Sequence, residues 1–452
     1  MRRLLFLSLL VYGLIIAGLV TLNGNVVALA MPLVIYLVAA FIYSPEKPRL
    51  VITRRLSAPI VHHDAPATVT LAIHNQGGQL EEVLIEDTVP QGLTVTDGEP
   101  WTHLSLPAGG KAEFSYTVKG KRGNYPFRHL HVTVNEHLGL FRHLGWLKVE
   151  GNLMVLPELL RLEHLDIRPL RTRGYAGPIP SRLAGSGVDF FGVREYQLGD
   201  PLRWLNWRAS ARHQHALFSN EFEMERIADV GLILDARQNN NVIVARDGGY
   251  DSLFEHAISA TAGLAEAFLN DGNRVGMLVY GRGLEMTYPG YGKVQRERIM
   301  QALAHSRTGD SLVFESMDYL PVRFFPAKSQ IVLVSPLREE DLAPLTRLRA
   351  RGYQVLVVSP DPVTFEAQKY APVTTADAAT ADATTAGTAI QLALRITHIE
   401  RELMLRRLRR VGIQVINWQV DRPFDRVMRT ALVRPMTPTR GGITNRIVRI
   451  ER

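Results

Sequence analysis

Buried strands alternate with amphipathic helices over residues 229–359, and this alternation constrains the fold more than any other feature of the sequence. The strands are short runs with an apolar interior, such as Asp229–Asp235 (DVGLILD) and Gln330–Ser335 (QIVLVS). Helical patterns separate them, for example over residues 252–269 and 295–304. Strands that alternate with helices of this length predict an α/β domain with a doubly wound parallel sheet.

The same pattern resumes after a low-complexity segment. Residues 374–388 (TTADAATADATTAGT) predict a flexible loop. A helix over 391–410 follows, and a last strand over 412–420 is expected to return to the sheet. We interpret the arginines of this helix as a solvated face. They are Arg401, Arg406, Arg407, Arg409 and Arg410.

Ahead of the α/β region, residues 49–158 show short alternating runs separated by turn residues. Ala67–Ile73 (ATVTLAI) and Ala112–Val118 (AEFSYTV) have the period of two that is typical of strands. Glycine-containing breakers such as Asn75–Gly78 stand between such runs. This spacing predicts an all-β sandwich of immunoglobulin-like type.

Two apolar runs, Leu4–Val20 and Val26–Tyr43, stand at the N-terminus with an uncharged turn between them. Each approaches the ~20 residues that a helix needs to cross a bilayer. Basic residues precede the first run and follow the second, so the positive-inside rule places both ends, and the soluble bulk, in the cytoplasm. We therefore expect a multi-pass protein of the cell (inner) membrane. The alternative is a signal peptide cleaved near Ala28–Ala30, which would export the soluble part.

A dense run of charged and aromatic residues, Gly185–Arg226, connects the β-rich and α/β regions. Asp200 and Pro201 predict the start of a helix, with Asp200 as its N-cap. That helix would carry Arg203, Arg208 and Arg212. The strand that follows would carry Glu221, Glu223 and Glu225 on one side. We expect these two sets to form a partly buried ion-pair network.

Many residues of this run recur at matched spacings in a known family. They are Arg194, Glu195, Tyr196, Gly199, Asp200, Arg203, Asn206, Trp207, Ser210, Arg212, Glu221, Glu223 and Glu225. The run resembles the core motif of the bacterial and archaeal family catalogued as domain of unknown function 58, with Asn206 where that family usually has aspartate. We interpret the motif as structural or partner-binding. Arginines beside its carboxylates lower their pKa, whereas a general acid needs a raised pKa.

The resemblance also implies that the α/β region is a von Willebrand factor A-type domain. That fold usually holds a divalent cation on oxygen ligands at the strand ends. Here Asp235 is present, but Arg237 and Asn239 replace two serines, and Ser335 stands where an aspartate is expected. This degenerate set predicts a binding domain with no metal and no cofactor.

Composition and motifs favour binding over catalysis. The chain of 452 residues has a formal net charge of +8 and no cysteine, which excludes disulfides, thiolate metal sites and a cysteine nucleophile. No phosphate loop or nucleic-acid-binding motif is present. We expect a non-enzymatic, membrane-anchored binding or scaffold protein that presents a metal-free A-type domain to cytoplasmic partners. The family resemblance implies one partner class, the MoxR-type AAA+ ATPases.

Two alternatives to this function stay open: a hydrolase that uses carboxylates around Asp200 and Glu221, and a metal-dependent adhesion module. The oligomeric state is also open. The expected organisation has five segments: two transmembrane helices (1–48), the sandwich (49–158), a linker with the core motif (159–227), the A-type domain (228–433) and a tail (434–452).

Overall fold

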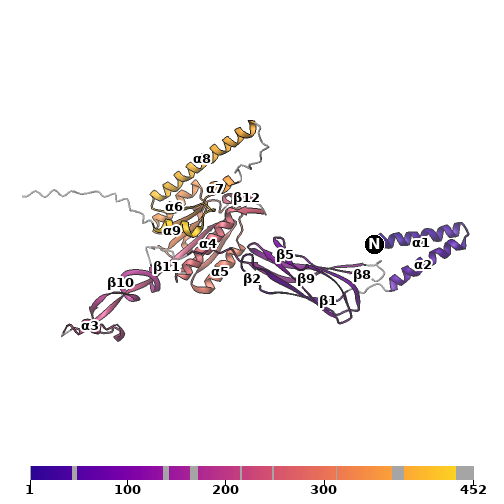
Figure 1. Ribbon diagram of the computed structural model, residues 1–452, viewed down its shortest axis with the longest axis horizontal. Coiled ribbons are helices and arrows are strands. Elements are labelled where there is room, and N and C mark those ends of the chain that lie inside the picture. The colour runs from indigo at the N-terminus through magenta and orange to yellow at the C-terminus, as the bar shows by residue number, and fades with distance from the viewer. Residues whose placement is uncertain are drawn as a thin grey trace, which may run out of the picture. The chain divides into compact units, whose positions relative to one another are not determined.

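The computed structural model divides into two compact units, Met1–Glu158 and Leu159–Arg452, which are described separately (Figure 1). Its described residues are 2–42, 48–135, 142–162, 172–213, 216–246, 249–311, 313–368 and 381–433. The expected tail over 434–452 lies outside them.

The first unit begins with two helices, α1 (Arg2–Val20) and α2 (Gly24–Ile42), which pack against each other. Among the described residues, α2 is the one helix that is long and apolar enough to cross a membrane. The apolar part of α1, Leu5–Val20, is shorter. One of the two expected spans is therefore supported.

The rest of this unit is a sandwich of two sheets. The four-stranded sheet has the order β1 (Leu50–Leu56), β3 (Ala67–Asn75), β7 (Lys111–Gly120), β5 (Leu93–Asp97). The five-stranded sheet has the order β2 (Ile60–Val61), β9 (Arg142–Val155), β8 (Gly123–Asn135), β4 (Leu80–Asp87), β6 (Trp101–Leu106). The β-rich middle region predicted from the alternating pattern is confirmed.

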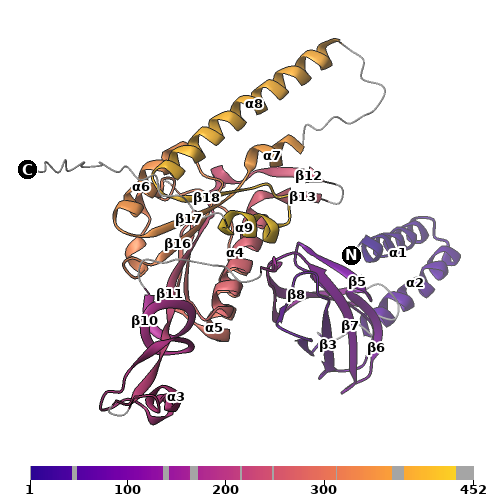
Figure 2. The same ribbon diagram turned by 60° about the vertical axis from the view of Figure 1, so that its left-hand side comes forward.

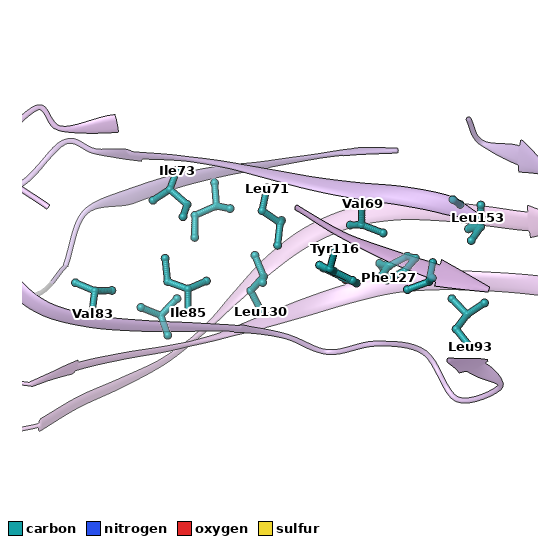
Figure 3. Packing of buried hydrophobic residues seen from close by; sticks show 14 of the residues in the cluster. Val69, Leu71, Ile73, Val83, Ile85, Leu93, Tyr116, Phe127, Leu130 and Leu153 are labelled. Carbon is teal, nitrogen blue, oxygen red and sulfur yellow. The ribbon is translucent and has the colours of Figure 1, made fainter. Parts of the chain in front are cut away.

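Strand alternation supplies the core of the sandwich. In β3 every second residue is buried, so Val69, Leu71 and Ile73 point inward. They pack between the sheets with residues from β4 and β8, such as Ile85 and Leu130 (Figure 3). Burying such apolar side chains stabilises the fold by about 1.5–3 kcal/mol for each large one.

One ion pair is enclosed in this core. The side chains of Arg54 and Asp87 are both fully buried, and the guanidinium of Arg54 lies 4.9 Å from the ring centre of Phe127. The hydroxyl of Tyr116 donates to Asp87 at 2.6 Å. Burial, and then the charge of Asp87, raise the pKa of Tyr116 well above its usual value. The pair joins strands β1 and β4 across the sandwich.

The second unit is built on one central sheet. Its strand order is β15 (Leu284–Gly290), β14 (Arg274–Tyr280), β11 (Phe218–Asp235), β16 (Gln330–Val334), β17 (Gln354–Pro360), β18 (Gln414–Trp418). The strands are parallel except for the edge strand β15. The predicted α/β region is confirmed, and its central strands are buried along nearly their whole length.

Helices cover this sheet. α4 and α5 pack against each other, while α6 and α8 contribute to a core cluster with alternate residues of β16 and β17. Their bounds are α4 (Leu253–Asn270), α5 (Gly292–His305), α6 (Leu342–Ala350) and α8 (Ala381–Arg410). The smaller elements are β12 (Ile243–Arg246), β13 (Gly249–Ser252), α7 (Pro362–Ala367) and α9 (Phe424–Val433).

A two-stranded arm leaves this domain. β11 continues beyond the sheet and pairs antiparallel with β10 (Thr172–Glu195). Figures 1 and 2 show the arm projecting from the domain, with the short helix α3 (Trp207–Ser210) at its far end. Residues 172–195, which belong to the segment 159–227 that was expected as a linker with the core motif, therefore form strand β10.

Two helix predictions also need correction. α8 begins at Ala381, ten residues before its expected start, so the end of the predicted flexible loop is helical. The start of that loop lies outside the described residues. Arg401 was expected on a solvated face but is buried, and it donates to the carbonyl of Pro336 and the hydroxyl of Ser359.

Candidate functional site

The sheet brings two of the expected site residues together at its carboxyl edge. Asp235 ends β11, and Ser335 follows the adjacent parallel strand β16. The chain turns to opposite sides of the sheet from these two strands, which is where open α/β sheets form binding crevices. The hydroxyl of Ser335 donates to Asp235 Oδ2 at 2.6 Å, and both side chains are buried.

Arg237 fills the centre of this edge. Its Nε donates to Asp235 at 2.9 Å and its Nη2 donates at 2.8 Å. Nη1 and Nη2 also donate to the two oxygens of Asp341 at 3.0 and 2.9 Å. The remaining N–H of Nη1 donates to the Glu315 carbonyl at 2.9 Å. All five guanidinium donors are thus satisfied.

These contacts keep the arginine charged. Burial alone would lower the pKa of Arg237, but hydrogen bonds and charge from Asp235 and Asp341 raise it above its usual value. Burial raises the pKa of Asp341, against the effect of Arg237. A fixed guanidinium therefore occupies the carboxylate oxygens that a divalent cation would need.

Two residues of this centre were missed from the sequence, and one was misplaced. Asn239 lies at the surface, where its amide reaches Glu315 at 3.4 Å. It is Asn240 that donates to Asp235, at 2.6 Å. Asp341 begins a helix far along the chain, and only its position after the strand β16 could have pointed to this edge.

A pocket of about 280 Å³ opens beside the buried arginine. Gly281 lines it and allows a close approach, because a Cβ there would lie 2.3 Å from the carbonyl carbon of Ala236. Asp310, Glu315 and Arg338 also line the pocket. Because both positive and negative side chains line the pocket, its charge selects neither an anionic nor a cationic ligand. Among the described residues, no group of three or more His, Asp or Glu side chains is placed to hold a metal.

The family-like motif lies in the arm rather than beside this edge. Arg194 near the end of β10 pairs with Asp200 at 2.7 Å and with Glu221 of β11 at 2.8 Å. The hydrogen bond from Arg194, followed by that from the Gln197 N–H, lowers the pKa of Asp200. The observed ion-pair network differs from the expected one. Its arginine is Arg194 of strand β10, and within the described part of the chain none of the expected arginines Arg203, Arg208 and Arg212 takes part in it.

The turn after β10 is fixed by local hydrogen bonds. The hydroxyl of Tyr196 donates to the carbonyl of Asp200 at 3.2 Å, and Gly199 has a φ of 109°, which favours glycine. Asp200 accepts the N–H of Gln197 at 3.0 Å and does not cap a helix. The predicted long helix is wrong. A single 3₁₀ turn, Leu202–Trp204, and the four-residue α3 take its place.

Asn206 performs the capping that was expected of Asp200. Its Oδ1 accepts the N–H of Ala209 at 2.9 Å, and its Nδ2 donates to Asn220 of β11 at 2.7 Å. An aspartate would cap equally well but could not donate to Asn220 when ionised. Ser210 completes this end by accepting the N–H of Phe218 at 2.8 Å. The asparagine at position 206, where the family usually has aspartate, thus has a side-chain amide partner in Asn220.

The far end of the arm exposes large apolar side chains beside arginines. The exposed fractions are 104% for Leu198, 74% for Leu202 and 71% for Trp207. The arginines Arg203, Arg208 and Arg212 are also exposed. We call these six residues the arm tip. Trp and Arg are enriched among residues that dominate binding energy at protein interfaces.

Of the remaining motif residues, some are exposed, and the side chains of others lie outside the described part of the chain. Glu195 is exposed, and its carbonyl accepts from Arg194 at 2.9 Å. Arg203 lies over the ring of Trp204, with its Cζ 5.8 Å from the ring centre. Arg212 is at the surface rather than in a buried network. The side chains of Glu223 and Glu225 lie outside the described residues.

Comparisons with known proteins agree with the motif. Residues 192–406 match the family model described as "Protein of unknown function DUF58". The Bacillus subtilis (strain 168) protein named "Uncharacterized protein YeaD" is 24% identical over 266 residues, which cover 58% of this chain. The match spans 63% of that relative's own length. The resemblance to the family is confirmed.

Solved structures give weaker similarities. The CARDB domain of the PF1109 protein from Pyrococcus furiosus, solved with di-metal ions, matches with a TM-score of 0.17 and 14% identity, covering 25% of this chain and 90% of that one. The cupredoxin domain of amoB from Nitrosocaldus yellowstonii also has a TM-score of 0.17 and 14% identity, covering 24% and 86%. Similarities of this size carry no conclusion about function.

Proposed function

We propose, for a chain whose residues 192–406 match the DUF58 family, that this protein is a non-enzymatic, membrane-anchored binding or scaffold protein that docks its partners through the arm tip. The observation that carries this proposal is the exposure of Leu198, Leu202 and Trp207 at the end of a hydrogen-bonded arm. These three side chains stand within ten residues of chain, and large apolar side chains that are exposed close together mark interaction sites.

The arm is organised to hold its tip in one geometry. Arg194 joins the turn to β11 through Asp200 and Glu221, while Asn206 and Ser210 join α3 to the same strand. A preorganised surface loses less conformational entropy on binding than a flexible one. The family motif therefore supports docking by positioning exposed residues.

The charges argue against the hydrolase alternative. Asp200 has a lowered pKa because Arg194 donates to its ionised form. Glu221 shares the same arginine. A general acid near neutral pH needs a pKa raised toward 7. The pKa of Asp200 is shifted in the opposite direction, which leaves binding as the better account.

The same reasoning favours an A-type domain that works without a metal. The strand order with one antiparallel edge, and an aspartate at the end of the central strand, are features that the A-type fold would share. The Arg237 guanidinium would stand in for the cation, because it satisfies Asp235 and Asp341 together. Docking would then be independent of Mg²⁺.

The anchor in this proposal is the N-terminal helical pair. α2 has the length and composition of a span, and α1 would cross beside it as a second one. The arginines and lysine that flank the pair favour a multi-pass topology with the soluble domains in the cytoplasm. The partner class that fits this location is a MoxR-type AAA+ ATPase.

Direct binding tests the proposal. The full-length protein is embedded in lipid nanodiscs and titrated with a purified MoxR-type ATPase, with ATP and with a non-hydrolysable analogue. Saturable binding that persists in EDTA is expected, since no metal is needed at the A-type domain. EDTA also removes Mg²⁺ from the ATPase, so nucleotide-free ATPase is the matched control. Absence of saturable binding in every nucleotide state would overturn the partner assignment.

A further inference from the structure

Helix α8 carries an apolar stripe that the domain does not cover. Leu392, Ile396, Ile399 and Leu403 have exposed fractions between 47% and 60%. Their spacings of four, three and four residues are those of the a and d positions of a heptad repeat. The stripe therefore has the geometry with which one helix packs along another.

The opposite side of the same helix holds it on the domain. Met404, Leu405 and Leu408 are buried in the core cluster with β16 and β17. Arg401, which is 7% exposed, reaches the loops after those strands. With 3.6 residues per turn, Arg401, Leu405 and Leu408 lie nearly opposite the stripe, and Met404 lies at its flank. Figure 2 shows α8 extending outward beyond the sheet. At the other end of the stripe, Leu403 borders a groove against Leu337 and Pro362 of the domain and is still 47% exposed.

We propose that this stripe binds the same stripe of a second copy of the chain, forming a short parallel two-stranded coiled coil. The charges that flank the stripe carry this choice of partner. With Ile396 and Leu403 at position a, Arg395 and Glu402 take position g, while Glu400 and Arg407 take position e. In a parallel pair each g residue faces the e residue five positions later in the other helix. Both facing pairs, Arg395–Glu400 and Glu402–Arg407, are then of opposite charge.

The opposite orientation satisfies fewer of these charges. In an antiparallel pair g residues face g residues and e residues face e residues. Packing Ile396 against Ile399 in this way would bring Arg395 to Glu402 but Glu400 to the uncharged Ala393. The parallel arrangement is therefore favoured by the sequence of the stripe.

Dimerisation requires only small rearrangements in each copy. Glu402 now contacts Arg406 at 2.8 Å, and Arg407 contacts Glu339 at 2.7 Å, in pairs whose side chains are all about half exposed or more. Exposed pairs of this kind contribute little and can be exchanged. The helix is already held by the domain, so association does not bear the cost of helix nucleation. Four core layers make a weak dimer, which suits the high local concentration within a membrane.

The absence of cysteine in the chain makes the test direct. Single variants Ile396→Cys and Ile399→Cys are made in the full-length protein, and His398→Cys is the matched control because His398 is exposed between them. Membranes are oxidised mildly and the chains are separated without reductant. A disulfide needs Cα atoms within about 7 Å. The parallel coiled coil predicts rapid cross-linking at 396 and 399 and slow cross-linking at 398.

Every other pattern counts against the proposal. Equal rates at all three positions would indicate random collision. Cross-linking that requires Ile396→Cys and Ile399→Cys chains to be mixed would indicate an antiparallel pair.

A charge exchange provides a second, independent test. Glu400→Arg in the Ile399→Cys chain should slow cross-linking severalfold, and adding Arg395→Glu should restore it; failure to restore would contradict the pairing. No partner protein is needed in either assay, so the result is independent of docking at the arm tip.

Discussion

The guanidinium of Arg237 donates to both oxygens of Asp235, from Nε to Oδ1 at 2.9 Å and from Nη2 to Oδ2 at 2.8 Å. These two residues, which are two positions apart in the chain, thus form a bidentate ion pair at the carboxyl end of the central strand. Bidentate pairs of this type combine charge with fixed geometry. Because Asp341 completes the same centre, two buried carboxylates share the single positive charge of this arginine.

Removing this arginine should destabilise the α/β domain. In Arg237→Met the two carboxylates remain buried without their cation, and such a loss costs about 3–5 kcal/mol. The free energy of unfolding of the full-length protein in urea, followed for the α/β domain, measures it. Arg338→Met is the control, because Arg338 lines the same pocket with a side chain that makes an exposed hydrogen bond to Asn239. An equal loss in both variants would contradict a special role for Arg237.

Magnesium should not stabilise the wild-type domain. Ser335, Asp235 and Asp341 offer oxygen atoms of the kind that Mg²⁺ prefers, but Arg237 already occupies the carboxylates. Thermal unfolding with and without Mg²⁺ should coincide for the wild type, whereas Arg237→Ser should gain a Mg²⁺-dependent rise in Tm. A wild-type stabilisation of about 2 kcal/mol at saturating metal would contradict the account, since it requires a bound ion.

The turn before the arm tip should loosen in acid. The pKa of Asp200 is lowered in the folded arm by Arg194 and then by the Gln197 N–H. Its contribution is therefore present above the unfolded-state pKa, near 4, and is lost as the pH falls through the folded-state value. Amide exchange of the Gln197 N–H, corrected for intrinsic rates, should accelerate in this range. Asp200→Asn should already exchange fast at neutral pH and change little with acid; retained protection in that variant would refute the role of Asp200.

The sequence predicted those parts of the structure that depend on local periodicity. Alternate burial in β3 follows directly from the pattern Ala67–Ile73, and the apolar run Ile331–Val334 became most of the fully buried strand β16. Strand periodicity was also seen after Phe218. The partner of that strand was missed: β11 continues past the sheet and pairs with β10. Pairing between strands is a tertiary property that the period of one segment does not contain.

The helix predicted after Asp200 failed for a related reason. Asp200 followed by Pro201 is a typical helix start, but in the arm Arg194 and the N–H of Gln197 bind the Asp200 carboxylate. The cap is then supplied six residues later by Asn206. Likewise, Arg237 was recognised as unfit for a metal site, but nothing nearby in the sequence indicated that Asp341 would share it. Long-range electrostatic partners are fixed by the fold rather than by spacing.

The central claim, that the arm tip is a docking surface, is tested most directly by one affinity comparison. Full-length protein in nanodiscs is titrated with a MoxR-type ATPase, as wild type, as Trp207→Ala and as Trp146→Ala. Trp146 is a matched control because it is 67% exposed but belongs to the sandwich. Loss of a dominant interface residue costs 2 kcal/mol or more, which is roughly a 30-fold rise in Kd. The account predicts this rise for Trp207→Ala, with an unchanged Tm and no effect of Trp146→Ala. Equal affinity for all three proteins would contradict it.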